Sequence, residues 1–280
     1  MGTNTSTKPE GIRFLRHSLS LAILLPALLI IGCVSIVTDD EHGEGADDEN
    51  QKHSFVVGEN PTIDVTGFNG AITITTGEDK KVNVEATLQI PNRVFYSATV
   101  SGNTVTIVAK KTGSGFSIGR SPSATIDLDV PAESTIIAHT SNGRINVDGV
   151  TGDGILDSSN GTITITDSDG SYASTTSNGS VKMIDVTGQF SAETSNGKIE
   201  FSGSFDENSD NNFKSSNGSI KVTFEDDPNL ELDARTSNGT VESEIPILVT
   251  TTEKGHIVGK YGDGSAELRI RTSNGSIDIR

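Results

Sequence analysis

Thr140-Ser141-Asn142-Gly143 is the first of seven closely similar tetrapeptides in the second half of this chain. Each copy is Thr or Ser followed by Ser, Asn and Gly, and the copies end at Gly143, Gly161, Gly179, Gly197, Gly218, Gly239 and Gly275. Their asparagines are Asn142, Asn160, Asn178, Asn196, Asn217, Asn238 and Asn274, at intervals of 18, 18, 18, 21, 21 and 36 residues. A repeat of this length is typical of a solenoid. The last interval leaves room for one degenerate copy near Lys254-Gly255.

Each tetrapeptide is followed by an alternation of apolar and polar residues. Apolar side chains stand three and five positions after the asparagine, as in Ile145 and Val147, with polar residues between them. This pattern, rich in β-branched residues, predicts a strand with one buried face. A second strand precedes each asparagine, with a small or apolar residue such as Ala138 or Leu156 four positions before it. Segments rich in Asp, Thr and Gly, such as 167–170, predict the turns between the two strands.

Asn-Gly is common in two-residue hairpin turns, because both residues accept positive φ. A hairpin would pair neighbouring strands antiparallel, yet the strands that flank each Asn-Gly do not match as mirror partners. A repeat of this length instead fits one coil of a parallel β-helix, with equivalent strands stacked about 4.8 Å apart. We therefore expect an all-β parallel β-helix in which each Asn-Gly turns a corner. We also expect the stacked Ser and Asn side chains to share hydrogen bonds.

One column of charges tests the stacking. Four residues after the asparagines, consecutive repeats carry Lys182, Glu200, Lys221 and Glu242, whose signs alternate. In-register parallel stacking would place these opposite charges side by side. Each exposed pair contributes only about 0–1 kcal/mol, so the column indicates register and adds little stability.

The first 37 residues have the pattern of a membrane-targeting segment. Residues 1–18 are polar and basic, and an apolar run over 19–37 follows, which predicts a cytoplasmic N-terminus. The run is just long enough for an uncleaved transmembrane anchor. Alternatively, Ile30-Ile31-Gly32-Cys33 resembles a bacterial lipobox, in which case Cys33 becomes the lipidated first residue of the mature protein. Either interpretation tethers the rest of the chain outside the membrane, at the cell envelope or cell surface.

Three segments follow this anchor or signal. Residues 38–54 are acidic and lack apolar periodicity, which predicts a disordered linker. Residues 55–135 contain alternating strands, such as the one after Asn69-Gly70, and we expect them to cap the solenoid. Residues 136–280 form the repeat β-helix. Because the chain stops directly after the last strand, we expect Asp278 and Arg280 to protect an exposed edge there, or that end to pair with another molecule.

Several of these features together resemble a known family. They are the strand Gly70-Ala71-Ile72-Thr73-Ile74, the segment Ile126-Asp127-Leu128-Asp129-Val130-Pro131, and the Ser-Asn-Gly coils that follow. Residues 55–280 resemble the putative adhesin domains of unknown function on bacterial surfaces, which are related to the head domain of putative autotransporter adhesins. The resemblance implies a β-helical extracytoplasmic domain, often anchored in the membrane. It transfers no catalytic or ligand-binding residues.

Composition and position favour a non-enzymatic surface module that binds a glycan, an envelope component or a protein. The net charge of −17 argues against nucleic acid, which requires a basic stripe. The extended face of a solenoid is a common binding surface.

A polysaccharide-active β-helix enzyme is the alternative. Such an enzyme needs clustered carboxylates. In the outward column three residues before the asparagines, Asp157 and Glu193 are two coils apart, about 10 Å at the usual strand spacing. We therefore expect no catalysis. Gly152-Asp153-Gly154 and Gly262-Asp263-Gly264 offer far fewer ligands than the six or so that calcium takes, so we expect neither a metal nor another cofactor.

Overall fold

The structure is a computed structural model that describes residues 48–113 and 120–280. The predicted segments 1–18 and 19–37, Cys33, and the linker up to residue 47 lie outside the described residues. The prediction of a disordered linker is wrong for residues 48–54, because they belong to a strand, Asp48–Val56, that pairs with Lys81–Gln89. The described part is built of strands, with one short 3-10 helix at Pro91–Arg93. Within residues 48–113 and 120–280, no helical segment has the length and apolar character needed to cross a bilayer. The expectation of an all-β solenoid is confirmed.

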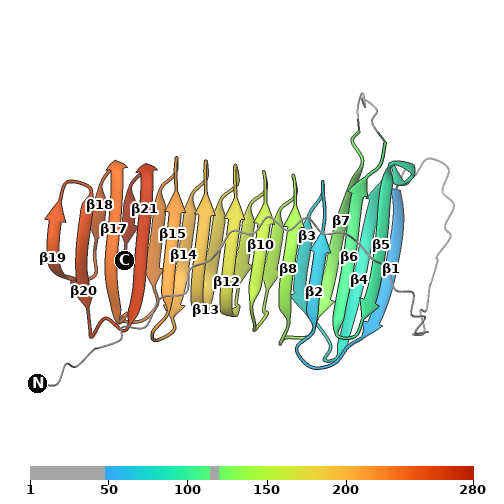
Figure 1. Ribbon diagram of the computed structural model, residues 1–280, viewed down its shortest axis with the longest axis horizontal. Helices are drawn as coiled ribbons and strands as arrows, with labels where there is room; N and C mark the ends of the chain where they lie inside the picture. The colour runs from blue at the N-terminus through green and yellow to red at the C-terminus, as the bar shows by residue number, and fades with distance from the viewer. Residues whose placement is uncertain (1–47, 114–119) are drawn as a thin grey trace, which may run out of the picture. The chain divides into compact units, whose positions relative to one another are not determined.

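The strands form two faces, which are stacks of mostly parallel neighbours (Figure 1). In spatial order the first face contains β5 (Val94–Ser101), β6 (Thr104–Lys111), β2 (Thr62–Thr66), β8 (Thr135–Thr140), β10 (Gly154–Ser158), β12 (Asp169–Thr176), the second half of β13 (Val181–Thr194), β15 (Asp210–Ser215), β21 (Ala266–Asn274), β17 (Leu230–Asn238), β20 (His256–Tyr261) and β19 (Leu248–Glu253).

The second face begins and ends at the same two ends of the stack. Its order is β1 (Asp48–Val56), β4 (Lys81–Gln89), β7 (Ser123–Val130), β3 (Ile72–Thr76), β9 (Ile145–Asp148), β11 (Ile163–Thr166), the first half of β13, β14 (Ile199–Phe205), β16 (Ile220–Phe224), β22 (Ile277–Ile279) and β18 (Val241–Ser243). Alternate side chains of both faces point inward and form one core, in which Ile136, Ile145, Ile163, Phe190 and Phe213 are fully buried.

Each coil therefore has two edges. A first-face strand ends at the Ser-Asn-Gly tetrapeptide, which passes the chain to the second face, and we call the row of these tetrapeptides the corner edge. A second-face strand then returns through a connection to the next first-face strand. We call the row of these connections, residues 148–153, 167–170, 184–188, 205–209 and 224–229, the turn edge.

The order of the last coils differs from the order of the sequence. β15 pairs with β21, and β21 pairs with β17, so the coil that contains Asn274 lies between the coils of Asn217 and Asn238. The expectation that the final strand forms an exposed edge is therefore wrong, because β22 lies between β16 and β18.

Core composition explains this order. Ile277 and Ile279 of β22 are fully buried, whereas β18 offers Val241 and Ser243 at the equivalent inward positions, and both are only half-buried. The Ser243 hydroxyl donates to the Ile245 carbonyl oxygen at 3.1 Å, but the side chain buries far less apolar surface than Ile279 does at the equivalent position. The coil with the better apolar pair therefore occupies the interior, and the coil with Ser243 lies at the end of the stack.

The segment around Lys254-Gly255 is not a degenerate coil, as the spacing had suggested. It is the turn of an antiparallel hairpin formed by β19 and β20, and β20 pairs antiparallel with β17. The first-face strands at the other end are likewise extended by β5, and β1 and β4 add two antiparallel strands to the second face. Antiparallel strands thus replace the regular coils at the ends of the stack.

The charge column follows the spatial order. Lys182 lies beside Glu200, with the ammonium nitrogen 3.6 Å from the carboxylate, and Glu200 lies beside Lys221. The next neighbour of Lys221 is Asp278, not Glu242. Glu242 instead lies next to Asp278, where two acids meet at the end of the stack. The alternation predicted from the sequence therefore holds for three of its four members.

Candidate binding surface

At the corner edge every residue of the tetrapeptide is used within the stack. In every copy but the first, the hydroxyl of the first residue donates to the glycine carbonyl of a neighbouring coil, as from Thr176 Oγ1 to Gly161 O at 3.0 Å and from Thr194 Oγ1 to Gly179 O at 2.9 Å. The buried Thr140 hydroxyl has no hydrogen-bond partner among the described residues. The glycine allows two backbones to approach, because a Cβ at Gly179 would overlap the Gly161 carbonyl oxygen. The corner glycines from 143 to 275 have no positive φ, so this approach requires glycine there.

The asparagines form a continuous amide ladder. From Asn142 onward, each side-chain nitrogen donates to the side-chain oxygen of the preceding asparagine in the stack, over distances of 2.7–2.9 Å. In spatial order the ladder contains Asn69, Asn142, Asn160, Asn178, Asn196, Asn217, Asn274 and Asn238. The predicted sharing of hydrogen bonds by asparagine is thus present. The corner edge is uncharged along the ladder and its amides are already paired with one another.

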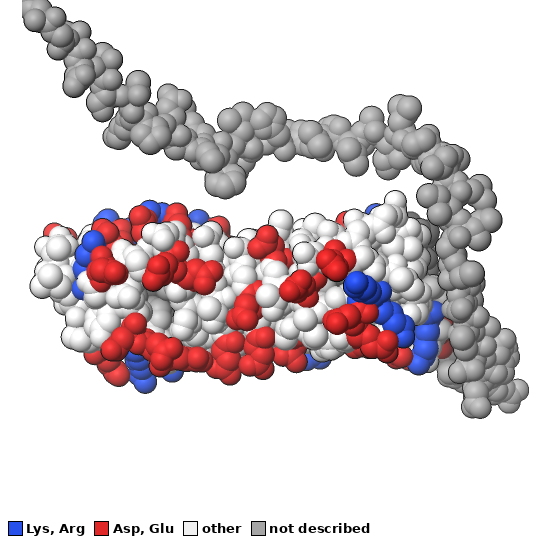
Figure 2. Space-filling model, turned by 90° about the horizontal axis from the view of Figure 1, so that it is seen from below, with Lys and Arg blue, Asp and Glu red and all other residues white. Residues whose placement is uncertain are grey.

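The turn edge has the opposite character. Its five connections carry ten exposed acidic residues and no Lys or Arg. They are Asp148, Asp153, Asp167, Asp169, Asp185, Asp206, Glu207, Glu225, Asp226 and Asp227. Figure 2 looks onto this edge and shows acidic side chains along its length. None of the ten forms an ion pair with another described residue.

Repulsion within this edge is visible at Glu225. Its carboxyl shares a hydrogen bond with Asp185, and the negative charges of Asp185, Asp226 and Asp167 add to that effect. Together these neighbours raise the pKa of Glu225 above its ordinary value. The carboxylates of successive turns are therefore close enough to influence one another.

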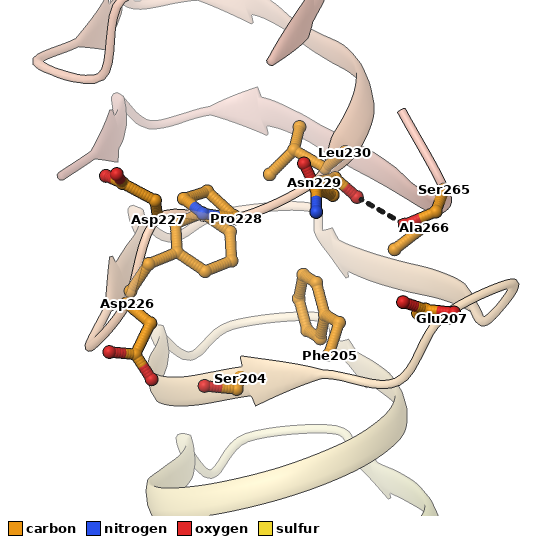
Figure 3. A pocket seen from close by; sticks show the side chains of 11 residues that line it. Ser204, Phe205, Glu207, Asp226, Asp227, Pro228, Asn229, Leu230, Ser265 and Ala266 are labelled. Atoms are coloured by element: carbon orange, nitrogen blue, oxygen red, sulfur yellow. Dashed lines mark hydrogen bonds between the residues drawn. The ribbon is translucent and has the colours of Figure 1, made fainter. Parts of the chain in front are cut away.

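A cavity of about 250 Å³ opens on the turn edge. It lies between the connections 205–209 and 224–229 and the start of β21 (Figure 3). Phe205, Phe224 and Leu230 form its apolar part. The rings of Phe205 and Phe224 meet edge to face, with centroids 5.4 Å apart. Polar residues complete the lining: Ser204, Glu207, Asp226, Asp227, Asn229 and Ser265.

Polar groups lie at both ends of this cavity, and two hydrogen bonds hold its lining in place. Phe205 and Asn229 face each other across it, with Glu207 at one end and Asp226 and Asp227 at the other (Figure 3). Ser265 Oγ donates to the Asn229 backbone oxygen at 3.3 Å, which joins β21 to the connection 224–229. The Tyr261 hydroxyl hydrogen-bonds Asp227, and this bond raises the pKa of Tyr261.

This cavity was not predicted from the sequence, although the lengths of the repeat intervals indicate where it lies. The intervals from Asn196 to Asn217 and from Asn217 to Asn238 are 21 residues long, where the preceding intervals are 18. The two longer coils contain connections 205–209 and 224–229, which line the cavity. Without the spatial order of the coils, the sequence could not show that Ser265 and Ala266 of the last repeat would complete it.

The carboxylates considered for catalysis lie elsewhere, on the outward side of the first face. Asp157 pairs with His139 Nδ1 at 3.0 Å, and Glu193 pairs with Lys214 Nζ at 2.6 Å. Thr175 lies between Asp157 and Glu193 in the register. The two carboxylates are thus not brought together, and each is engaged by a neighbouring basic side chain.

Another polar cluster on the first face is an ion-pair network that was not predicted from the sequence. Asp233 interacts with Arg271 and, at 2.9 Å, with His256 Nε2. Although burial opposes ionisation, these two partners lower the pKa of Asp233. Among the described residues, no three His, Cys, Asp or Glu side chains are grouped to hold a metal ion, and this includes Asp153 and Asp263 of the two calcium-like turns.

The fold and the surface define a β-solenoid with an internally paired corner edge and an acidic turn edge. This chain belongs to the Toastrack DUF4097 family, whose model matches residues 120–280. The family resemblance expected from the sequence is therefore confirmed, although the early strand at Gly70–Ile74 lies outside the matched part. A comparison with curated proteins gives no significant match.

Solved structures with a similar fold come from several bacteria. A putative adhesin from Bacteroides fragilis is 16% identical, with a TM-score of 0.45 over 83% of this chain and 97% of that one. A putative cell adhesion protein from Clostridium sporogenes is 13% identical, with a TM-score of 0.39 over 82% and 99%. A putative lipid binding protein from Parabacteroides distasonis is 12% identical, with a TM-score of 0.37 over 85% and 98%.

Proposed function

We propose that this protein is a membrane-anchored, extracytoplasmic, adhesin-like module that binds a glycan or a protein of the cell envelope or cell surface without catalysis. The observation that carries the proposal is the difference between the two edges. Ten carboxylates that form no ion pair with another described residue, and a cavity, lie on the turn edge, while the asparagines of the corner edge are paired with one another. An exposed surface with one sign of charge attracts partners of complementary charge.

Membrane anchoring is part of the same proposal. The apolar run 19–37 or a lipidated Cys33 would hold the chain in the membrane, and the acidic segment 38–47 would separate the solenoid from the bilayer. Mass spectrometry of the mature N-terminus distinguishes the two anchors. A lipidated Cys33 at the N-terminus identifies a lipoprotein, whereas an intact chain from Met1 identifies an uncleaved anchor. A chain that is cleaved without lipid would contradict both.

The absence of catalysis is proposed on the arrangement of the outward carboxylates. Asp157 and Glu193 are separated by Thr175 and each is paired with a neighbouring basic group. A pair that works as acid and base needs both carboxyl groups at one bond. Cleavage of a polysaccharide that is lost on Asp157→Ala or Glu193→Ala would contradict this part of the proposal.

Binding is tested with the full-length protein, purified in a nonionic detergent and immobilised. We expect saturable binding to a cell-envelope or cell-surface fraction, and weaker binding at high salt because exposed charges are screened. Replacing Asp148, Asp167 and Asp185 by Asn should weaken binding. The matched control replaces Ser141, Ser159 and Ser177 of the corner edge by Ala and should bind normally. Failure of the wild-type protein to bind any such fraction would overturn the proposal.

A further inference from the structure

The cavity on the turn edge has the charge of a cation site. Glu207 lies at one end, and Asp226 and Asp227 lie at the other. No Lys or Arg lines the cavity, and none occurs in the five connections of the turn edge. An anionic ligand would be repelled by the lining and by the rest of this edge, whereas a cation would be attracted to both.

The volume of the cavity and its apolar lining limit which kind of cation can bind there. A volume of about 250 Å³ is smaller than the roughly 300–1,000 Å³ of sites that hold whole small-molecule ligands, so it fits one side chain or a short amine. A hydrated metal ion has no use for Phe205, Phe224 and Leu230, whereas an alkyl stem packs on such groups and keeps its charged end near carboxylates. Phenyl rings also attract organic cations directly.

Asn229 adds a hydrogen-bonding group opposite the ring of Phe205. Its side-chain amide faces the cavity, and it has no hydrogen-bond partner among the described residues (Figure 3). The amide nitrogen points toward Phe205 (Figure 3), while the amide oxygen lies against Gly262, so the carboxylates are the acceptors that the cavity offers to an N–H donor. Carboxylate, amide and aromatic groups are therefore combined in one recess.

We infer that this cavity binds the ammonium or guanidinium group of a lysine or arginine side chain presented by a partner protein. The inference rests on the proposed function and deepens it, since it names the chemistry of the partner. The acidic turn edge would attract a basic segment of the partner, and the cavity would accept one of its side chains. Glu207 and Asp226 contact the charge, while Phe205 contacts the stem.

The test is isothermal titration calorimetry on the full-length protein in nonionic detergent at low salt. The probes are the peptide Lys-Gly-Lys-Gly-Lys, the same peptide with its lysines acetylated, and n-pentylammonium chloride. Acetylation removes the positive charge and keeps the stem. We expect the unmodified peptide and pentylammonium to bind one site, and the acetylated peptide to bind at least about tenfold more weakly.

Three variants locate the binding. Phe205→Leu keeps an apolar side chain but removes the ring, and should weaken binding about tenfold. Glu207→Gln with Asp226→Asn removes two exposed charges at the cavity and should weaken it further. The matched control, Asp148→Asn with Asp153→Asn, removes two charges from the same edge at least three strand spacings away, about 14 Å. Because Asp148 and Asp153 belong to the turn edge but not to the cavity, we expect this control to weaken binding of the short probes much less than the cavity variant does.

Several results would overturn the inference. Equal weakening by the two charge variants would show a general attraction to the acidic edge, and unchanged binding by Phe205→Leu would remove the ring from the site. Binding of pentylammonium without binding of the peptide would contradict a protein partner. If these results occur while the wild-type protein still binds an envelope fraction, the proposed function stands and the cavity assignment fails. If no fraction is bound, the proposed function fails by its own test.

Discussion

The corner edge and the turn edge belong to the same coils and experience opposite constraints. Stacking repeats the corner at every coil, with asparagine amides 2.7–2.9 Å apart and glycines in backbone contact. The connections of the turn edge differ in length and expose ten acids. An edge that repeats one hydrogen-bonding arrangement leaves little freedom for change, whereas an edge of exposed connections tolerates insertions and new side chains. Stability should therefore depend mainly on the corner edge and binding mainly on the turn edge.

Replacing a corner glycine should have the largest effect on stability. In Gly179→Ala the new methyl group would overlap the Gly161 carbonyl oxygen and meet Thr176 Oγ1. Neither group can move without separating two coils, so we expect the free energy of unfolding to fall by about 3 kcal/mol or more. Urea unfolding followed by circular dichroism measures this change.

Gly102→Ala is the control for that substitution. Gly102 lies in the turn between β5 and β6 with φ of 59°, and nothing lies within 4 Å of an added Cβ. Only backbone strain applies there, so the cost should be about 1–2 kcal/mol. An equal loss in both variants would show that close approach at the corners is not what requires glycine.

Breaking the amide ladder should have the next largest effect. Asn178 donates to Asn160 and accepts from Asn196, so Asn178→Ala removes two hydrogen bonds. At about 0.5–1.5 kcal/mol each, the loss should be about 1–3 kcal/mol. Asn238 lies at the end of the ladder and only donates, to Asn274. Asn238→Ala should therefore cost about half as much, and equal costs would mean that the ladder contributes no stability of its own. Thermal unfolding of both variants makes this comparison.

The same difference between the edges determines how much of the structure the sequence could predict. The corner repeats with little variation, so Asn142 to Asn238 and their glycines could be assigned to corners from spacing alone. The spatial order of the coils could have been predicted only by giving weight to Ser243. It occupies an inward position at which all the other repeats have an apolar residue. A single polar residue in a column is a weak signal. The insertion of the last coil was therefore missed.

The cavity was missed for a related reason. The intervals of 21 residues show that the coils containing connections 205–209 and 224–229 each have three more residues than the preceding coils. However, Phe205 and Phe224 meet only because their coils lie close together in the stack, and Ser265, just before the inserted strand β21, hydrogen-bonds the Asn229 backbone of connection 224–229. Contacts between residues this distant in the sequence follow from the order of the coils. The acidic charge of the turn edge, by contrast, can be read directly from the sequence of the connecting segments.

The asparagine ladder of the corner edge should add no pH dependence to the free energy of unfolding, because amides do not titrate. We expect the pH dependence of stability between about pH 5 and 7 to come from His53 of β1. This ring stacks between Phe55 and Tyr96, and burial lowers its pKa below 6.5. The unfolded chain therefore takes up a proton first as the pH falls, so stability is lost from pH 6.5 downward toward the folded pKa.

His53→Phe should flatten this part of the profile while it keeps the aromatic stack. Melting temperatures of the wild-type protein and the variant, recorded at intervals from pH 7.5 to pH 5, give the comparison. Parallel profiles would contradict the assignment to His53.

The smallest expected effect lies on the turn edge, at Glu225. The hydrogen bond with Asp185 and the charges of Asp185, Asp226 and Asp167 raise the pKa of Glu225, so its ionised form opposes folding slightly at pH 7. The folded protein then takes up this proton before the unfolded chain, and stability rises as the pH falls through the folded pKa toward 4.5. Glu225→Gln should accordingly melt at or just above the wild-type temperature at pH 7, and the difference should shrink as the pH approaches 4.5. A variant that melts well below the wild-type protein at pH 7 would show that this carboxylate holds the turn together, and the division of labour between the two edges would be wrong at this coil.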